Sequence, residues 1–152
     1  CFADPVDAGA RTALARARLA TDGTVRLADT TVIFRQEGPL STGNHFGCRI
    51  VQAADGNLFL SMGDHFRPRD EAQSLANHLG KIVRIRPDGS VPDDNPFVGR
   101  AGAKPEIWSY GHRNSQGLAL QPGTGKLWEE EHGPRGGDEI NIVEKGKNYG
   151  GR

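Results

Sequence analysis

The chain has 152 residues with 19 basic and 19 acidic side chains, so its formal net charge is zero. This balance, without a basic cluster, argues against a protein that binds nucleic acid by neutralising phosphates. No apolar run approaches the roughly 18 residues that cross a bilayer, so we expect no membrane span.

Glycine is over-represented, at 21 residues, and nine prolines add to the number of helix-breaking positions. Long helices therefore have little room, and we expect many short strands within one domain over residues 1–152. The first five residues are neither a methionine start nor a signal peptide, which suggests that the beginning of the protein is missing. Cys1 and Cys48 could form one disulfide or remain two thiols, so they do not fix the redox compartment.

Nine segments have the β-branched or alternating composition that is typical of strands. In chain order they are residues 13–20, 30–34, 49–53, 58–62, 82–86, 107–110, 117–120, 126–128 and 139–143. Only residues 70–79 suit a short helix, with Gly80 in the place of a C-cap glycine.

Asp-Gly turns recur along the chain at Asp22-Gly23, Asp55-Gly56 and Asp88-Gly89, 33 residues apart, and a looser glycine turn at 123–125 follows. Such pairs favour type I′ hairpins. Hairpins at this period predict an all-β fold, a β-propeller of four-stranded antiparallel blades. A closed propeller needs about four to eight blades, so 152 residues make a partial propeller of three to four blades. The alternative is four unrelated hairpins in an ordinary all-β domain.

Three polar clusters follow strand-like segments. In the first, His45 lies among glycines, and Asp64 follows a predicted strand. A loop histidine beside a carboxylate can act as a general base, because the carboxylate fixes its tautomer and stabilises the imidazolium. The alternative is a histidine in a turn or an interface.

The second cluster, residues 109–117, contains Arg113 next to Asn114. These side chains can bind the oxygens of a quinone, carboxylate or carbonyl ligand. The alternative is a solvated turn in which Arg113 forms a structural ion pair.

The third cluster, residues 129–139, is rich in carboxylates and contains the tight turn Gly133-Pro134. Carboxylate and backbone carbonyl oxygens are the ligands that Ca²⁺ takes, although EF-hand spacing is absent. No CxxC pair, phosphate-binding loop, GxSxG elbow or HExxH motif occurs, which excludes many common enzyme classes.

In this order the three clusters resemble the glucose/sorbosone dehydrogenase family. Its members are soluble aldose sugar dehydrogenases that depend on pyrroloquinoline quinone (PQQ) and fold as six-bladed β-propellers. The likeness extends over about residues 13–150. The matching stretches are residues 45–50, 55–59, 63–64, 79–85, 88–92, 95–97, 111–119, 131–141 and 148–150.

The resemblance implies a role for each matching residue. His45 matches the base that takes the proton from the sugar's anomeric hydroxyl, and Asp64 matches the carboxylate that orients it. Arg113 and Asn114 match residues that contact PQQ.

The resemblance also implies two calcium positions. Gly133 and Pro134 match the turn whose backbone carbonyls hold the catalytic Ca²⁺, and Glu139 and Tyr149 match ligands of a second, structural Ca²⁺. The parent protein would oxidise the anomeric C–OH of an aldose to a lactone, pass electrons to an external acceptor, and reside in the periplasm or be secreted.

Some features depart from the family. Asn44 stands where some members carry an acidic residue, and the family's first and C-terminal blades have no counterpart. We therefore expect an incomplete site that is inactive in isolation, with open sheet edges through which copies could pair as a homo-oligomer. Two alternatives remain: a non-catalytic calcium-binding propeller module for protein or carbohydrate recognition, and a calcium-dependent lactonase or hydrolase.

Overall fold

The computed structural model describes residues 1–40 and 43–150, and it consists of three antiparallel sheets. The first sheet is formed by β1 (Phe2–Val6), β2 (Gly9–Ala20) and β3 (Arg26–Arg35). The second has the order β4 (Ile50–Gln52), β5 (Leu58–Ser61), β6 (Lys81–Ile85) and β7 (Ile107–Tyr110). The third has the order β10 (Glu139–Val143), β9 (Leu127–Glu131) and β8 (Ser115–Leu120).

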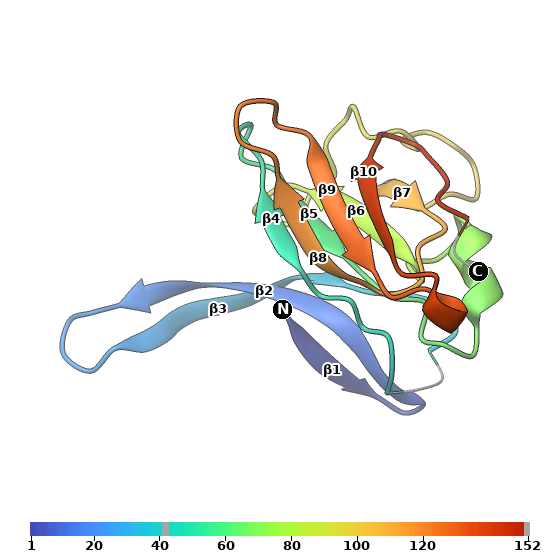
Figure 1. Cartoon of the computed structure of the whole chain (residues 1–152). Coiled ribbons are helices and arrows are strands. Elements are labelled where there is room, and N and C mark those ends of the chain that lie inside the picture. The colour runs from blue at the N-terminus through green and yellow to red at the C-terminus, as the bar shows by residue number, and fades with distance from the viewer. Residues whose placement is uncertain (41–42, 151–152) are drawn as a thin grey trace.

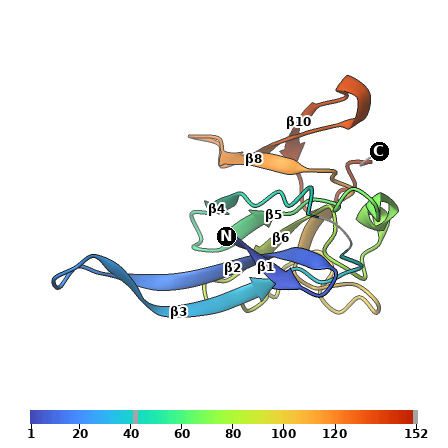
Figure 2. The ribbon, with the colours of Figure 1, turned by 90° about the horizontal axis from the view of Figure 1, so that it is seen from below.

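The sheets follow one another as layers, with the four-stranded sheet in the middle (Figures 1 and 2). Successive antiparallel sheets of this kind are propeller blades, and they confirm the predicted all-β partial propeller. All nine predicted strands form, with shifted ends. The sequence did not reveal β1, which contains Asp4 and Pro5 and is an edge strand, where proline is tolerated.

Two apolar cores hold the layers together, one on each face of the middle sheet. Between the first and second sheets lie Leu14, Phe34, Leu60, Met62, Val83 and Ile85. Between the second and third lie Phe59, Ile82, Leu118, Leu127 and Val143. Because successive side chains of a strand point to opposite faces, Phe59 enters one core and Leu60 the other. Covering both faces explains why every residue of β6 is buried.

The Asp-Gly turns differ in two ways from the prediction. Gly56 has a φ of 85° and Asp55 does not share its positive φ. The bonds from Gly56 N to Ala53 O and from Ala53 N to Asn57 O are those of a type I turn followed by a left-handed residue, so the type I′ prediction is wrong. Asp88-Gly89 forms no hairpin between neighbouring strands, because a connection of about twenty residues separates β6 from β7.

The predicted helix over residues 70–79 is also wrong: a short 3₁₀ turn, η1 (Arg69–Gln73), forms instead. The Nζ of Lys81 takes the carbonyls of Glu71 and Ala72 as acceptors. Further along, the Asn77 side chain accepts from the backbone N–H of Leu79, and such local bonds compete with a helix. Among the described residues no helix is long and apolar enough to cross a membrane.

Candidate active site

His45 and Asp64 form a close pair. His45 Nδ1 lies 2.7 Å from Asp64 Oδ1, which also accepts the backbone N–H of Phe66 at 2.8 Å. The Asp64 side chain is 2% exposed and that of His45 15%, so little water competes for the contact. With Asp64 ionised, His45 carries its proton on Nδ1 and keeps Nε2 as the basic nitrogen. The structure thus brings the predicted base and its orienting carboxylate together.

Gly63 allows the loop that carries His45 to lie against the end of β5. A Cβ atom at Gly63 would stand 1.9 Å from the carbonyl oxygen of His45, which is far inside van der Waals contact. His45 itself has a φ of 53°, a conformation that non-glycine residues rarely adopt. Close contact with the backbone of Gly63 therefore restricts the conformation of the His45 loop.

A disulfide joins Cys1 to Cys48, with Cα atoms 6.1 Å apart, which decides the question that the sequence left open. It connects the start of the first sheet to the loop three residues after His45. A hydrogen bond of 2.8 Å from Thr12 Oγ1 to the carbonyl of Phe46 makes a second link between the same parts. The first sheet therefore supports the candidate base.

Arg113 and Asn114 lie between β7 and β8, against the loop of His45. The Asn114 Oδ1 accepts the backbone N–H of Gly47 at 3.2 Å, and Asn114 is 5% exposed. Arg113 donates from Nη1 to the carbonyl of His132 at 2.7 Å. The alternative of a structural ion pair for Arg113 is not seen in the part of the chain that the structure describes, where its side chain bonds a backbone carbonyl.

A pocket of about 670 Å³ opens beside these residues and is partly enclosed by positive side chains. Of the predicted site residues it contacts Asp64, Arg113 and Pro134. Four further lining residues were not predicted from the sequence: Phe66, Arg69, Asp70 and Arg135. Phe66 follows Asp64 by two residues and Arg135 follows Pro134, so their position next to a motif was a signal for these two. Asp70 begins the segment predicted as a helix and Arg69 precedes it, and no motif pointed to either.

Gly133 and Pro134 form the entry to the 3₁₀ turn η2 (Pro134–Gly136). A Cβ at Gly133 would meet the carbonyl oxygen of Gly137 at 1.7 Å, so only glycine allows this turn to close. The carbonyl of Pro134 accepts the N–H of Gly137 at 3.1 Å and retains a second lone pair. These backbone oxygens can still bind a cation.

Glu139 and Tyr149 do not bring their side chains together. Glu139 begins β10, where its carboxylate accepts from Asn141 Nδ2 at 3.1 Å. The Tyr149 hydroxyl lies at the other end of the strand, donating to the carbonyl of Ile142 and accepting from the N–H of Glu144, each at 2.7 Å. A calcium ion shared by the two residues would need other atoms of Tyr149.

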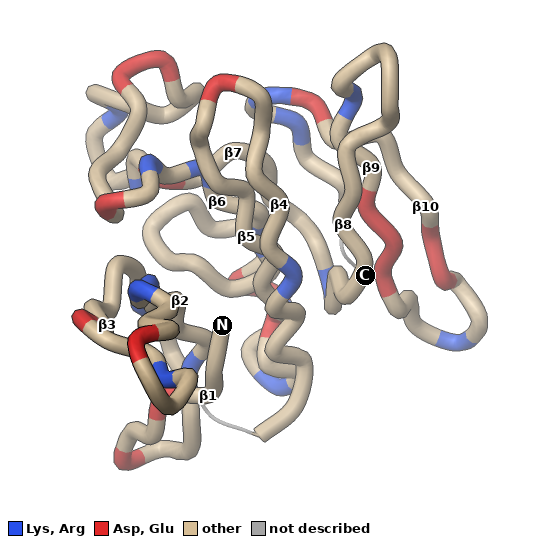
Figure 3. Tube along the Cα trace, turned by 90° about the vertical axis from the view of Figure 1, so that its left-hand side faces the viewer, with Lys and Arg blue, Asp and Glu red and all other residues tan. Residues whose placement is uncertain are grey.

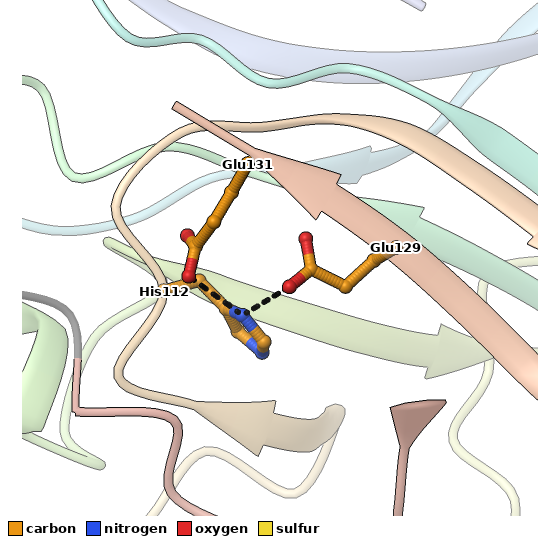
Figure 4. Close-up of side chains that lie close together, drawn as sticks. All are labelled: His112, Glu129 and Glu131. Atoms are coloured by element: carbon orange, nitrogen blue, oxygen red, sulfur yellow. Dashed lines mark ion pairs between the residues drawn. The ribbon is translucent and has the colours of Figure 1, made fainter. Parts of the chain in front are cut away.

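A buried cluster of His112, Glu129 and Glu131 joins the second polar segment, residues 109–117, to the third, residues 129–139 (Figure 4). The sequence did not predict that these three residues meet. Figure 3 shows an acidic stretch along β9, the strand that contains both glutamates. Glu131 Oε2 accepts the backbone N–H of Arg113 at 2.5 Å. Burial, aided by the neighbouring Glu129, raises the pKa of Glu131 to about 8.

The chain is similar to known proteins over nearly its whole length. The sequence profile described as Glucose / Sorbosone dehydrogenase matches residues 1–151. The aldose sugar dehydrogenase YliI of Escherichia coli K12 is 51% identical over 144 residues, covering 95% of this chain and 38% of that protein.

Two solved structures extend the comparison. The soluble aldose sugar dehydrogenase (Asd) from E. coli in its apo form superposes with a TM-score of 0.92 at 50% identity, over 97% of this chain and 42% of that one. The PQQ-bound aldose sugar dehydrogenase (Adh) from Streptomyces coelicolor gives 0.76 at 32% identity, over 90% and 39%. The chain therefore spans less than half the length of the proteins it matches. It belongs to the glucose/sorbosone dehydrogenase family.

Proposed function

We propose that this chain forms the base-carrying part of a larger propeller that oxidises the anomeric C–OH of an aldose to a lactone. In that protein PQQ would supply the hydride acceptor, Ca²⁺ would supply a Lewis acid, and an external acceptor would remove the electrons. One observation carries the proposal: His45 lies 2.7 Å from Asp64, and Asp64 lines a pocket that Arg113 and Pro134 also line.

The proton step is assigned to His45. Its Nδ1–H donates to Asp64, so Nε2 is available to take the proton of the sugar hydroxyl. Asp64 stabilises the imidazolium that results, because its carboxylate is held by the N–H of Phe66 and is shielded from water. A neutral imidazole suits this role near neutral pH.

The pocket has the chemistry that a planar, polyanionic quinone requires. Three arginines (Arg69, Arg113 and Arg135) line it beside two carboxylates (Asp64 and Asp70), and Phe66 adds an aromatic surface. Guanidinium groups bind carboxylates through paired hydrogen bonds. We assign Arg113 to direct contact with PQQ and Asn114 to the wall behind it.

The residues also fit calcium, whose ligands are oxygens. We assign the catalytic ion to the backbone carbonyls of Gly133 and Pro134, and a second, structural ion to Glu139 and Tyr149. For the second position the Glu139 carboxylate is the accessible donor, since the Tyr149 hydroxyl is already bonded on both sides.

We further propose that the protein works in the periplasm or outside the cell. The Cys1–Cys48 disulfide supports this, because such bonds persist in oxidising compartments. The 152 residues alone are expected to be inactive, since they cover only 38% to 42% of the three relatives described above. Pairing of copies through open sheet edges remains a prediction.

The second candidate is a non-catalytic calcium-binding module for protein or carbohydrate recognition. An oriented imidazole favours the enzyme, because recognition alone does not need a histidine whose tautomer is fixed by a buried carboxylate. The Arg113–Asn114 segment beside the Gly133-Pro134 turn likewise fits a quinone site better than a lactonase centre.

The test is dye reduction by the full-length propeller protein, loaded with PQQ and Ca²⁺ and supplied with aldoses. We expect turnover that requires both additions and falls by at least about 100-fold in His45→Ala. Lys126→Ala, in the exposed β8–β9 turn, is the control and keeps wild-type activity. Full activity of His45→Ala would contradict the role of His45, and calcium binding without any turnover would favour the recognition module.

A further inference from the structure

The buried side chains of His112, Glu129 and Glu131 point toward one another (Figure 4). His112 comes from the β7–β8 loop and is fully buried, while the two glutamates lie on the inward face of β9 and are each 2% exposed. One ligand atom of each residue lies within 4.8 Å of the other two. Two ligands of one cation held at about 2.0–2.6 Å stand no more than roughly 4–5 Å apart, so the spacing suits a shared ion.

The atoms that face the centre of this cluster make no hydrogen bonds to one another. His112 Nδ1 lies 3.6 Å from Glu129 Oε1 and 4.0 Å from Glu131 Oε1, which is too far for a hydrogen bond. Neither His112 Nδ1 nor Glu129 Oε2 has another partner. Polar atoms this deeply buried are normally paired, because an unpaired one has lost its hydrogen bonds to water without replacement.

Hydrogen bonds to residues around the cluster orient its side chains. His112 Nε2 lies 2.8 Å from Ser109 Oγ, so an Nε2–H donated to Ser109 leaves Nδ1 free as a ligand. Glu129 Oε1 accepts from Asn141 Nδ2 at 2.8 Å. The His112 ring also stacks on Tyr149, with centroids 4.8 Å apart. Hydrogen bonds that orient ligands from behind are a regular feature of metal sites.

Protonation of one of these three side chains, without a metal ion, explains their spacing less well than a bound cation does. A protonated carboxyl or imidazolium between these groups would draw the heavy atoms to about 2.6–3.2 Å, whereas they stand 3.6 and 4.0 Å apart. A divalent cation fills that space and balances the charge of two carboxylates. The donor set of one imidazole nitrogen and two carboxylates suits Zn²⁺ or Mn²⁺, whereas Ca²⁺ takes oxygen ligands only.

We propose that His112, Glu129 and Glu131 bind a divalent transition-metal ion, Zn²⁺ or Mn²⁺, in preference to Ca²⁺. This site is separate from the calcium positions assigned to Gly133, Pro134, Glu139 and Tyr149. Its ion would brace the segment that carries Arg113, because Glu131 also accepts the Arg113 N–H. The role is structural, and the proposal does not depend on the enzyme activity.

The test measures metal binding and not turnover. The full-length protein is stripped with a chelator, and calorimetry follows the addition of ZnCl₂, MnCl₂ or CaCl₂. Glu129→Gln and Glu131→Gln should weaken Zn²⁺ or Mn²⁺ binding by at least about tenfold. Glu130→Gln is the matched control, because this residue lies between them on the opposite face of β9 and should bind as the wild type does.

A second measurement needs no variant and so does not depend on variants folding. X-ray absorption of the metal-loaded wild-type protein should show imidazole scattering with light donors at about 2.0–2.2 Å. Absence of imidazole in the spectrum, equal affinity in all three glutamine variants, or Ca²⁺ binding as tight as Zn²⁺ and Mn²⁺ at this cluster would each overturn the proposal.

Discussion

The backbone N–H of Asp64 donates to the carbonyl oxygen of Arg113 across 2.9 Å. This bond joins the end of β5 to the loop before β8, and so connects the second sheet to the third. The residue whose carboxylate orients His45 is therefore joined through its backbone to the residue whose guanidinium lines the pocket. A shift of either loop would therefore move both sides of the candidate site.

The Asp64–His45 contact gives the first prediction. In Asp64→Asn the amide no longer fixes the Nδ1–H tautomer or stabilises the imidazolium, so kcat should fall by about 10²–10⁴-fold. Steady-state dye reduction by the full-length protein measures this. Asp93→Asn, at an almost fully exposed carboxylate, should leave kcat unchanged. An Asp64→Asn protein as active as the wild type would exclude this role.

The second prediction concerns the space at Gly63. In Gly63→Ala the new methyl group would collide with the carbonyl of His45, so the loop must move. We expect a loss of about 1–3 kcal/mol in the free energy of unfolding, together with lower activity. Gly43→Ala, in the same loop, meets nothing within 4 Å and should stay within about 0.5 kcal/mol of the wild type. Urea denaturation measures both, and equal effects would contradict the steric argument.

The third prediction tests the disulfide. Cys1→Ser removes a cross-link between residues 47 apart in sequence and should lower the free energy of unfolding by about 2–5 kcal/mol. Dithiothreitol should destabilise the wild type by a similar amount and leave Cys1→Ser unchanged. If the reductant affects both proteins equally, the bond does not stabilise the fold.

The fourth prediction concerns Lys81, which is fully buried and whose Nζ donates to the carbonyl of Leu79 as well as to two carbonyls of η1. Burial lowers its pKa to about 7, from 10.5. Between these pH values the unfolded chain binds the extra proton, so the free energy of unfolding should rise with pH from about 7 to 10.5. The slope would be at most about 1.4 kcal/mol per pH unit.

Urea denaturation at pH 7, 8 and 9 tests the Lys81 prediction. Lys81→Met should lack this rise in stability, while Lys126→Met, at an exposed lysine, should retain it. Parallel pH profiles in Lys81→Met and the wild type would show that Lys81 does not titrate in this range.

Several features could be predicted because they depend on residues close together in the sequence. Alternating and β-branched segments identified nine strands, and the motifs around His45, Arg113 and Gly133 identified the family. The predicted helix at residues 70–79 was wrong because carbonyls of this segment accept hydrogen bonds from the Nζ of Lys81. Lys81 lies outside the segment, and its side chain reaches these carbonyls only once β6 has packed. The strand β1 was missed because it is defined by pairing with β2 rather than by its own composition.

The sequence by itself determined the class of fold, the family, and the chemistry available at the turns, since local propensity and motif spacing are properties of short segments. Only the tertiary structure decided that Cys1 and Cys48 pair, which arginines line the pocket, and that His112 meets two glutamates of β9. Each of these contacts joins residues from different strands or loops, and their distances are set by how the sheets stack. The zero net charge argued against binding to nucleic acid. The candidate site, by contrast, depends on where the folded sheets place the side chains of Asp64 and Arg113.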